Sequence, residues 1–491
     1  MFYKSEELKL NSSLKILFIV YTHSNGGGGE SVLTTLVNNL PNFWQIDILE
    51  VMSFGVKKEP INQNIKLLQP LTKRRDHTKF YRFFNPVLIN KPQLVKDIYK
   101  LEDYDVVISW IPLYSMFMLP VFDEAKKILW FHGMIDGLPP FSYPLDDDYY
   151  EEKWELNLKK NVAEYVDSVV LISKMCLKSF NKNFPEYSKK ARVIYNGTDV
   201  ENIIEHSKEK ITDSKLLEIF QKNEPALIVI GCLDRNKNFS LALEALKILK
   251  ERNVFCNLIV LGFETEDVDL HKLANSLGIE KQVYFLGYQQ NPLPFLCRSK
   301  LLLITSFAEG FPTVATEAMA LGIPFVTTPV SGTSEELANN GSCGLVSNWN
   351  AQEYADKIEK LLTDEALYQT MSKACKEHIK DYSVENFVNS FKKELEVVPK
   401  KTTKEKKKKK NYFLSILLFI FYSSFYLAID NKHKISVLKS RWFNLIHKPN
   451  ISNFYKFIYG FVINFIFLLS FPFFLFMSSF LIFRSLKHRE I

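Results

Sequence analysis

The sequence predicts two α/β domains, each a doubly wound parallel sheet covered by helices, and a hydrophobic helical tail at the C-terminus. Short, almost continuously apolar runs alternate with longer helical patterns, and such runs are typical of strands buried on both faces of a parallel sheet. This strand–helix series occurs twice along the chain, as expected for two domains of the same class. The length of 491 residues also suits two or three domains, at about 100–200 residues per domain.

The first series lies in a predicted domain of residues 13–202. Helical patterns separate its apolar runs, so a parallel sheet is expected. A segment rich in Lys and Glu follows at residues 203–224 and is interpreted as a linker. The predicted strands are residues 16–21, 46–51, 106–110, 128–131, 169–172 and 193–195.

The second series lies in a predicted domain of residues 225–365, which is similar in size. The helical pattern that follows it, residues 366–396, is expected to pack back on the first domain. The predicted strands are residues 226–230, 258–261, 283–286, 301–305, 325–328 and 345–346, and the predicted helices are residues 241–252, 270–277, 314–321 and 351–362.

The C-terminal tail differs in composition from the rest of the chain. A Lys-rich linker at residues 397–410 precedes residues 411–491, which hold 16 of the 40 Phe residues. Two stretches have no charged residue, 18 residues at 412–429 and 27 residues at 457–483. Because a membrane-spanning helix needs about 20 apolar residues, we expect the first stretch to lie in the membrane interface and the second to span the membrane or bend back at Pro472. The alternative is that both are helices of a protein core.

The net charge of +7 is an average over two segments of opposite sign. Residues 400–491 hold 17 Lys and Arg against three acidic residues, whereas residues 1–399 hold 45 basic and 52 acidic residues. An acidic body argues against nucleic acid as a partner, and a basic tail favours an anionic membrane surface. Six scattered cysteines and a polar N-terminus without a signal-peptide pattern indicate a reducing, cytoplasmic compartment.

Two turns with the composition of phosphate-binding loops open the two domains. Gly27, Gly28, Gly29 and Glu30 stand between the first predicted strand and a helix, where backbone N–H groups can approach an anion. This turn is neither a dinucleotide fingerprint nor a P-loop, because it lacks the GxGxxG spacing and the GK[ST] sequence.

The second turn follows the first strand of the second domain. It contains Gly231, Arg235 and Lys237, and a cation at such a strand end can neutralise a diphosphate. A basic loop is more often merely solvated, so this turn alone is a weak indication of function.

The third motif is the most specific. Glu309 ends a strand, and Glu317 follows in the next helix with seven residues between them. The intervening Gly310, Phe311, Pro312, Thr313 and Val314 can present backbone amides at a helix N-terminus. This pattern predicts two carboxylates that hold hydroxyl groups, with a site for an anion between them.

Taken in order, these motifs resemble those of the family 4 glycosyltransferases, retaining enzymes of the GT-B fold with two Rossmann-like domains facing a cleft. The two glutamates correspond to the E-x7-E signature of that family. The resemblance runs from Lys15 to Leu395. Further matching motifs are ILWFHG at 128–133, which contains His132, NGTD at 196–199, Gly332 to Glu336, and GSCG at 341–344.

The resemblance implies that Lys237 contacts the donor diphosphate, Glu309 binds the donor sugar and Glu317 holds the ribose of the nucleotide. His132 is implied near the reacting centre. The turn at Gly27–Gly29, with Glu30, is implied to face the acceptor and the phosphates. The implied catalytic set is His132, Lys237 and Glu309, and the implied donor-binding set is Gly231, Arg235, Lys237, Glu309, Gly310, Phe311, Pro312, Thr313, Val314 and Glu317.

No bound metal and no cofactor are implied, because the nucleotide sugar is itself a substrate. Asp146, Asp147 and Asp148 formally contain a metal-binding DxD, but their proline-rich and polar surroundings favour a solvated loop.

One position departs from the family pattern. Arg usually follows the glycine of the second turn, and here Cys232 stands in its place. Arg235 in the same turn is expected to supply the missing guanidinium. Without such a replacement, the loss of one electrostatic partner typically lowers a rate about 10²–10³-fold.

The sequence therefore predicts a retaining glycosyltransferase of hexosyltransferase type. It is expected to move a sugar from a nucleotide sugar, expected to be UDP-linked, to a hydroxyl of a lipid-linked or membrane-proximal glycan, in polysaccharide or glycoconjugate biosynthesis. The expected location is the cytoplasmic face of the cell membrane, held there by the tail. The alternatives are a nucleotide-sugar epimerase on the same fold, or a catalytically silent membrane scaffold, which Cys232 would explain.

Overall fold

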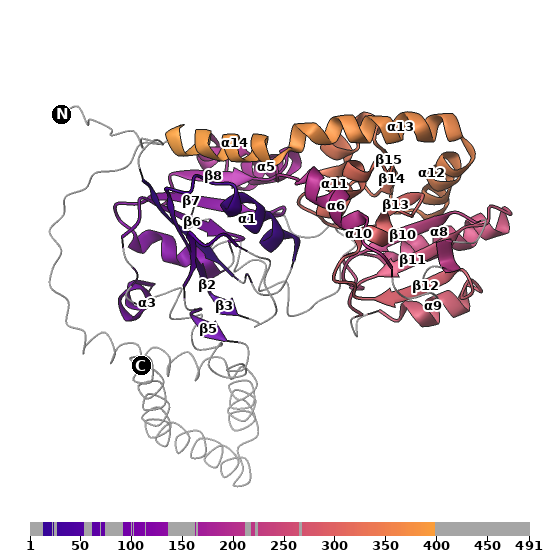
Figure 1. Ribbon diagram of the computed structural model, residues 1–491, viewed down its shortest axis with the longest axis horizontal. Helices are drawn as coiled ribbons and strands as arrows, with labels where there is room; N and C mark the ends of the chain where they lie inside the picture. The colour runs from indigo at the N-terminus through magenta and orange to yellow at the C-terminus, as the bar shows by residue number, and fades with distance from the viewer. Residues whose placement is uncertain are drawn as a thin grey trace, which may run out of the picture. The chain divides into compact units, whose positions relative to one another are not determined.

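The computed structural model of the chain contains two compact units, residues 1–71 with 103–403 and residues 72–102 with 404–491 (Figure 1). The first unit holds both large sheets. In the second unit, the described elements are β5 (Thr72–Lys73) and α3 (Pro92–Ile98). The residues that the structure describes are 13–21, 23, 27–53, 61–68, 70–73, 92–99, 101, 103–112, 114–135, 163, 165–211, 218–220, 224–264 and 268–397.

The first sheet has seven parallel strands in the order β4-β2-β1-β6-β7-β8-β9. Every residue of β6, β7 and β8 is buried, which explains why these strands are mostly apolar runs. The strands are β1 (Lys15–Val20), β2 (Gln45–Glu50), β4 (Ile65–Leu67), β6 (Val106–Trp110), β7 (Lys126–Phe131), β8 (Ser168–Leu171) and β9 (Ala191–Val193), with the short β3 (Met52–Ser53) nearby in sequence. The helices are α1 (Gly28–Asn38), η2 (Tyr114–Val121), α5 (Lys174–Asn183), η3 (Pro185–Lys190) and α6 (Val200–Ser207).

The second sheet has six parallel strands in the order β12-β11-β10-β13-β14-β15. The strands are β10 (Ala226–Ile230), β11 (Asn257–Leu261), β12 (Val283–Gly287), β13 (Leu301–Ile304), β14 (Phe325–Thr327) and β15 (Gly344–Val346). The helices are α8 (Phe239–Glu251), α9 (Leu270–Ser276), α10 (Leu293–Leu296), α11 (Thr313–Leu321), η4 (Thr333–Leu337), η5 (Asn339–Gly341), α12 (Ala351–Thr363), α13 (Glu365–His378), η6 (Ile379–Tyr382) and α14 (Val384–Val397).

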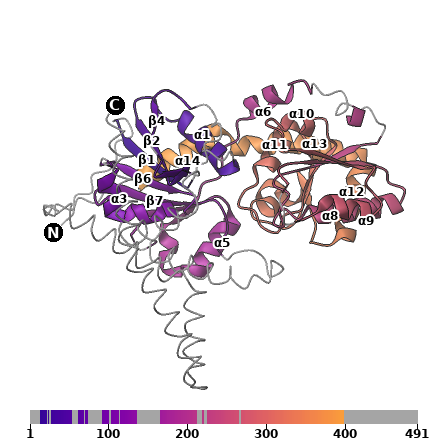
Figure 2. The ribbon, with the colours of Figure 1, turned by 90° about the horizontal axis from the view of Figure 1, so that it is seen from below.

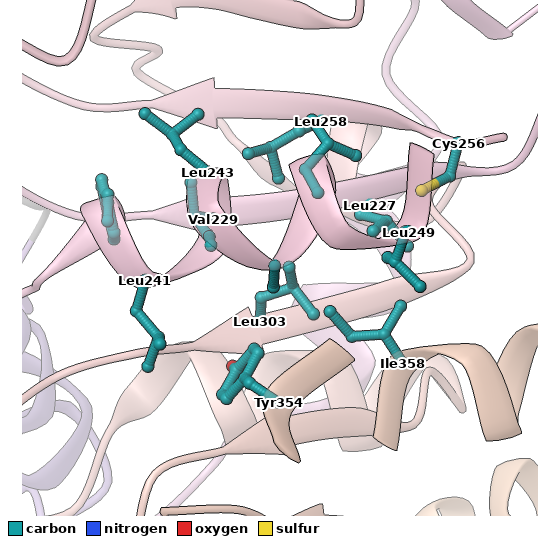
Figure 3. Close-up of a cluster of buried hydrophobic side chains, with 14 of the residues drawn as sticks. Leu227, Val229, Leu241, Leu243, Leu249, Cys256, Leu258, Leu303, Tyr354 and Ile358 are labelled. Atoms are coloured by element: carbon teal, nitrogen blue, oxygen red, sulfur yellow. The ribbon is translucent and has the colours of Figure 1, made fainter. Parts of the chain in front are cut away.

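The core of the second sheet shows why these segments form amphipathic helices. Figure 3 shows Leu243 and Leu249 of α8 in one buried cluster with Leu227 and Leu258 of the strands. Tyr354 of α12 is completely buried in the same core. Burial of each such side chain contributes about 1.5–3 kcal/mol, so both helices are fixed on this sheet by their apolar faces.

The strand orders confirm the predicted doubly wound α/β class. In each sheet the order reverses beside the first strand, between β1 and β6 and between β10 and β13. Open sheets of this kind bind ligands outside the carboxyl ends of their strands at such a reversal. The turns that follow these four strands are therefore the first places to look for a site.

The C-terminal helical pattern, expected as one segment at 366–396, consists of α13, η6 and α14. Ser383 interrupts it with an extended backbone, and its Oγ accepts a hydrogen bond from the backbone N–H of Asn386 at 3.2 Å. Phe391 of α14 lies 6.2 Å from the ring of Phe18 and 5.9 Å from that of Trp130, in the first sheet. Figures 1 and 2 show α14 beside this sheet.

Buried polar groups also join α14 to the first sheet. Lys126 of β7 donates to the backbone carbonyl of Leu395 at 2.9 Å, at the end of the helix where a cation is favourable. Glu394 forms an ion pair with Arg192 at 3.1 Å and accepts a hydrogen bond from Ser168. Burial lowers the pKa of Lys126 to about 8.

The predicted linker is partly helical, and the predicted tail cannot be compared with the structure. The segment 203–224, predicted as a linker, begins inside α6, which continues to Ser207. The predicted tail, residues 411–491, and nearly all of the Lys-rich linker lie outside the described residues. Within the part of the chain that is described, no helix is both long and apolar enough to cross a membrane.

Candidate active site

The turn after β10 is formed by close backbone approaches that require glycine. Gly231 donates its N–H to the carbonyl of Leu261 at 2.9 Å. At Gly262, where φ is +150°, an added Cβ would lie 1.7 Å from the carbonyl oxygen of Gly231. The ends of β10 and β11 therefore touch through main chain alone. This contact brings the turn at Gly231 to the carboxyl edge of the sheet.

An ion pair joins the turns on the two sides of the strand reversal. Nζ of Lys237, after β10, lies 2.6 Å from Oε1 of Glu309, after β13. Ser306 donates its hydroxyl to the same Oε1 at 2.7 Å. The side chains of Lys237 and Glu309 are 25% and 14% exposed, so a ligand can still reach them. The structure thus brings together two of the three predicted catalytic residues.

The second glutamate of the motif, Glu317, lines a cavity that Glu309 does not line. Glu317 is on α11, and with Thr313 it lines a cavity of about 1110 Å³. Lys237, Glu309 and His132 are not among the lining residues. The other lining residues are a mixture of apolar, charged, hydroxyl and amide side chains, and the hydroxyl and amide ones include Ser31, Thr35, Asn202, Gln289 and Gln290.

The glycine turn of the first domain, at Gly27–Gly29, faces helix α11. Gly27 is the N-cap of α1, and its carbonyl accepts the N–H of Glu30 and of Ser31, both at 3.1 Å. A Cβ added at Gly28 would lie 3.3 Å from Oγ1 of Thr313. The N-terminus of α1 therefore lies against that of α11, and both helix ends favour an anion between them.

His132 follows β7 and is held by aromatic rings. Its ring lies 4.3 Å from that of Trp110 and 6.4 Å from that of Trp130, measured between centroids. Nε2 is buried without a hydrogen-bond partner among the described residues. Burial lowers the pKa of His132 to about 3, so the imidazole is neutral at physiological pH.

The backbone of His132 meets the E-x7-E segment directly. A Cβ added at Gly310 would lie 2.1 Å from the carbonyl oxygen of His132 and 2.7 Å from Cδ1 of Ile172. A side chain at position 310 would therefore prevent the segment after β13 from approaching the segment after β7. Nearby, Glu336 accepts the N–H of Lys174 at 2.7 Å, at the N-terminus of α5.

Sequence reasoning missed two aromatic residues at the carboxyl edge. Phe263 and Tyr288 each follow a glycine at the end of a strand, β11 and β12 respectively. Their rings are stacked with 4.2 Å between centroids and 11° between planes, and they are 56% and 54% exposed. Phe263 also accepts the N–H of Leu233 at 2.8 Å, which ties this pair to the turn that carries Lys237. The sequence signal was an aromatic residue directly after a strand-ending glycine.

The remaining predicted residues are placed as follows. Cys232 and Arg235 are both exposed on the turn after β10. Phe311 and Pro312 are buried at the start of α11, where Pro312 is the N-cap, and Val314 is half-buried in its first turn. The described residues contain no cluster of His, Cys, Asp and Glu that could hold a metal ion. Asp146–Asp148 lie outside them.

Two family models match this chain. Residues 26–202 match the model described as Glycosyltransferase Family 4, and residues 193–378 match the model described as Glycosyl transferases group 1. The chain is 24% identical over 384 residues to a Methanocaldococcus jannaschii protein named as an uncharacterized glycosyltransferase, covering 72% of this chain and 89% of that protein.

A second relative is a Campylobacter jejuni protein named as an α-1,4-N-acetyl-D-galactosaminyltransferase, with an undecaprenol-diphosphate-linked glycan in its name. It is 24% identical over 376 residues, which cover 76% of this chain and 95% of that protein. The crystal structure of Anabaena HepE in complex with UDP-glucose has a TM-score of 0.58 at 18% identity, covering 78% of this chain and 99% of that one. The two family matches and this shared fold show that the chain belongs to the family 4 glycosyltransferases of GT-B fold and is a glycosyltransferase.

Proposed function

We propose that this glycosyltransferase moves a sugar from a UDP-linked donor to a hydroxyl of a lipid-linked or membrane-proximal glycan, with retention at the anomeric carbon. The observation that carries the proposal is the Lys237–Glu309 pair at the strand reversal of the second sheet, 2.6 Å apart and partly exposed. A cation and a hydroxyl-binding carboxylate side by side suit a sugar that is attached to a diphosphate.

The same residues account for donor binding. The Lys237 ammonium exchanges Glu309 for the donor diphosphate, which frees the carboxylate to accept hydrogen bonds from sugar hydroxyls. The N-terminus of α11 adds favourable amides for the anion. Glu317, which lines the cavity, is suited to the hydroxyls of a ribose.

The uracil ring is proposed to stack on the exposed pair of Phe263 and Tyr288. Stacking of a base on an aromatic side chain is worth about 1–3 kcal/mol. The backbone carbonyl of Phe263 is hydrogen-bonded to Leu233 in the turn that carries Lys237, which supports a base site and a diphosphate site on neighbouring turns.

In the reaction, the acceptor oxygen forms a bond to the anomeric carbon on the face from which the diphosphate departs. The bond between that carbon and the diphosphate oxygen breaks, and the leaving UDP takes the electron pair and the acceptor proton. Protein groups orient both substrates and stabilise the developing charge. His132 is neutral, so its contribution is a hydrogen bond or a contact rather than a positive charge. No metal or further cofactor is included in the proposal.

The proposal of a lipid-linked or membrane-proximal acceptor rests on the expected location of the enzyme at a membrane. Residues 400–491, which are the tail and most of the Lys-rich linker, carry 17 Lys and Arg and 16 Phe residues, which suits a membrane with anionic lipids, at about 1 kcal/mol per basic residue near the surface. We place the enzyme on the cytoplasmic face of the cell membrane, in assembly of a surface polysaccharide or glycoconjugate. A lipid-linked glycan also appears in the name of the Campylobacter relative.

The test is to incubate membranes containing the full-length protein with a panel of labelled nucleotide sugars. Label from a UDP-sugar in the lipid phase, lost with Lys237→Ala and with Glu309→Ala, is expected. Turnover of donor alone to an isomeric nucleotide sugar would support an epimerase, and no turnover with any donor would support a silent scaffold. Neither alternative is favoured by the relatives, which are named as glycosyltransferases. For the anchor, the truncation of residues 400–491 is fractionated, and a truncated protein found wholly with membranes would contradict it.

A further inference from the structure

The Lys237–Glu309 pair is assembled from two loops that are 72 residues apart in sequence. Loop residues do not hold a 2.6 Å separation by themselves, since each loop has many accessible conformations. Some group must therefore fix one turn against the other. The structure identifies that group as Asn236, which directly precedes Lys237 and contacts Ala308, the residue directly before Glu309.

The side chain of Asn236 bridges the two turns. Its Nδ2 donates to the carbonyl of Ala308 at 3.1 Å, and its Oδ1 accepts the N–H of the same residue at 3.1 Å. The carbonyl of Asn236 also accepts the N–H of Phe307 at 2.8 Å. Three hydrogen bonds thus run from the residue before Lys237 to the two residues before Glu309.

A second residue strengthens this cross-link from the other side. Thr305, which is completely buried, donates its hydroxyl to the carbonyl of Lys237 at 2.7 Å. Asp234 accepts the N–H of Lys237 at 2.9 Å, which fixes the turn itself. The backbone on both sides of the ion pair is therefore hydrogen-bonded independently of the pair.

The segment after β13 is anchored to the rest of the domain as well. The carbonyl of Ser306 accepts the hydroxyl of Thr328 at 2.6 Å and the indole N–H of Trp349 at 2.9 Å. Asn236 therefore joins the turn after β10 to a loop that is already held. This arrangement makes it a clamp rather than one more surface contact.

We propose that Asn236 is a positioning residue that holds Lys237 and Glu309 at the spacing needed to bind the donor diphosphate and sugar together. This inference rests on the proposed donor function, and it adds a residue that neither charge nor motif singles out. A side-chain amide offers a donor and an acceptor side by side in one planar group, as the backbone of Ala308 requires. An Asp at this position would present an oxygen to the carbonyl of Ala308. When the diphosphate replaces Glu309 at Lys237, the clamp keeps both groups in place, which is electrostatic preorganisation.

The experiment uses the full-length protein with the variants Asn236→Ala, Asn236→Asp, Thr305→Val and Thr305→Ser. Three quantities are measured: UDP affinity by calorimetry, kcat and KM for the labelled UDP-sugar that the wild type uses, and backbone hydrogen exchange over residues 305–309. Gln282→Ala is the matched control, because its side-chain amide donates to the carbonyl of Cys256 at 3.2 Å at the opposite end of the same sheet.

Both Asn236 variants and Thr305→Val are expected to increase exchange at Phe307 and Ala308 and to lower kcat about 10–100-fold, since small misplacements of reacting groups are costly. Asn236→Asp is expected to be at least as impaired as Asn236→Ala. Thr305→Ser, which keeps the hydroxyl, and Gln282→Ala are expected to stay within about twofold of wild type in kcat. Melting temperatures are measured for every variant, so that a loss of kcat can be separated from a loss of folded protein.

Wild-type exchange and wild-type kcat in Asn236→Ala and Thr305→Val would overturn the clamp. If Asn236→Ala fails to fold, the Thr305→Val and Thr305→Ser pair still decides the question. Wild-type protein that neither binds UDP nor uses a UDP-sugar would instead count against the proposed donor. In that case, the hydrogen exchange of the variants would still decide whether Asn236 holds the two turns together.

Discussion

Replacing Gly310 with alanine is expected to force apart the two segments that meet at His132. The new methyl carbon would lie 2.1 Å from the carbonyl oxygen of His132 and 2.7 Å from Cδ1 of Ile172. Ordinary contacts between carbon and a carbonyl oxygen are about 3.3–3.6 Å, so a displacement of roughly 1 Å is needed. The obstacle on the His132 side is main chain at the end of β7, which cannot rotate away as a side chain can.

The size of the effect follows from that displacement. If the segments stay in place, overpacking costs about 1–3 kcal/mol of stability. If they separate by roughly 1 Å, the acceptor side moves relative to Lys237 and Glu309, and such a misplacement lowers the rate by about 10²-fold. The UDP affinity should change by less than about threefold, because Lys237 and Glu309 lie on the same sheet edge and hold their own pair.

The assay compares sugar transfer, UDP affinity by calorimetry and melting temperature for Gly310→Ala and for Gly133→Ala. Gly133 is next to His132, and a Cβ added there meets nothing within 4 Å, so this variant should behave as wild type. The reasoning is refuted if Gly310→Ala keeps both the kcat and the melting temperature of Gly133→Ala.

Three further predictions concern other parts of the molecule. Tyr288→Ala should weaken UDP about tenfold through lost stacking but leave inorganic pyrophosphate unchanged, and equal losses for both ligands would contradict base stacking on Tyr288 and Phe263. Burial holds the pKa of His132 at about 3 against 6.5 in the unfolded chain. The unfolded chain therefore binds more protons between these values, and the free energy of unfolding should rise with pH there by up to about 1.4 kcal/mol per unit. Urea titrations at several pH values should show a smaller slope for His132→Gln, and an unchanged slope would contradict this. Glu394→Ala should cost roughly 3 kcal/mol in chemical denaturation by leaving Arg192 without its buried partner, whereas a cost under about 1 kcal/mol would show that the Glu394–Arg192 pair does not help to hold α14 on the sheet.

The strands could be predicted because burial on both faces leaves a strong sequence signal. The strand at β10 was predicted with the bounds that the structure has, and β6 likewise. β4 was missed because its three residues at the sheet edge include two exposed ones, which removes the apolar pattern. The break at Ser383 was missed because a serine that caps α14 does not interrupt the helical periodicity on either side.

The site could be predicted only as far as local motifs extend. Glu309 and Lys237 were identified from their positions after strands, but their 2.6 Å pairing depends on which strands are neighbours. Asn236 and Thr305 carry no charge, and their partners are 72 and 68 residues away, so no spacing reveals them. Phe263 appears as a surface residue until the sheet brings it against Tyr288.

The pairing of Lys237 with Glu309 bears on the unusual Cys232. Where the family resemblance implies an arginine, this chain has an exposed thiol, so the turn after β10 holds fewer fixed positive groups toward a diphosphate. Lys237 is then the cation whose backbone is held on both sides: its N–H donates to Asp234, and its carbonyl accepts the hydroxyl of Thr305. A point charge compensates for a missing bidentate partner only if it is well placed, because an ammonium lacks the directional fork of a guanidinium. The substitution at Cys232 therefore raises the importance of the Asn236 clamp, and the combined variant Cys232→Arg with Asn236→Ala should recover part of the activity that Asn236→Ala loses. Equal activity of the single and the combined variant would show that the two positions act independently.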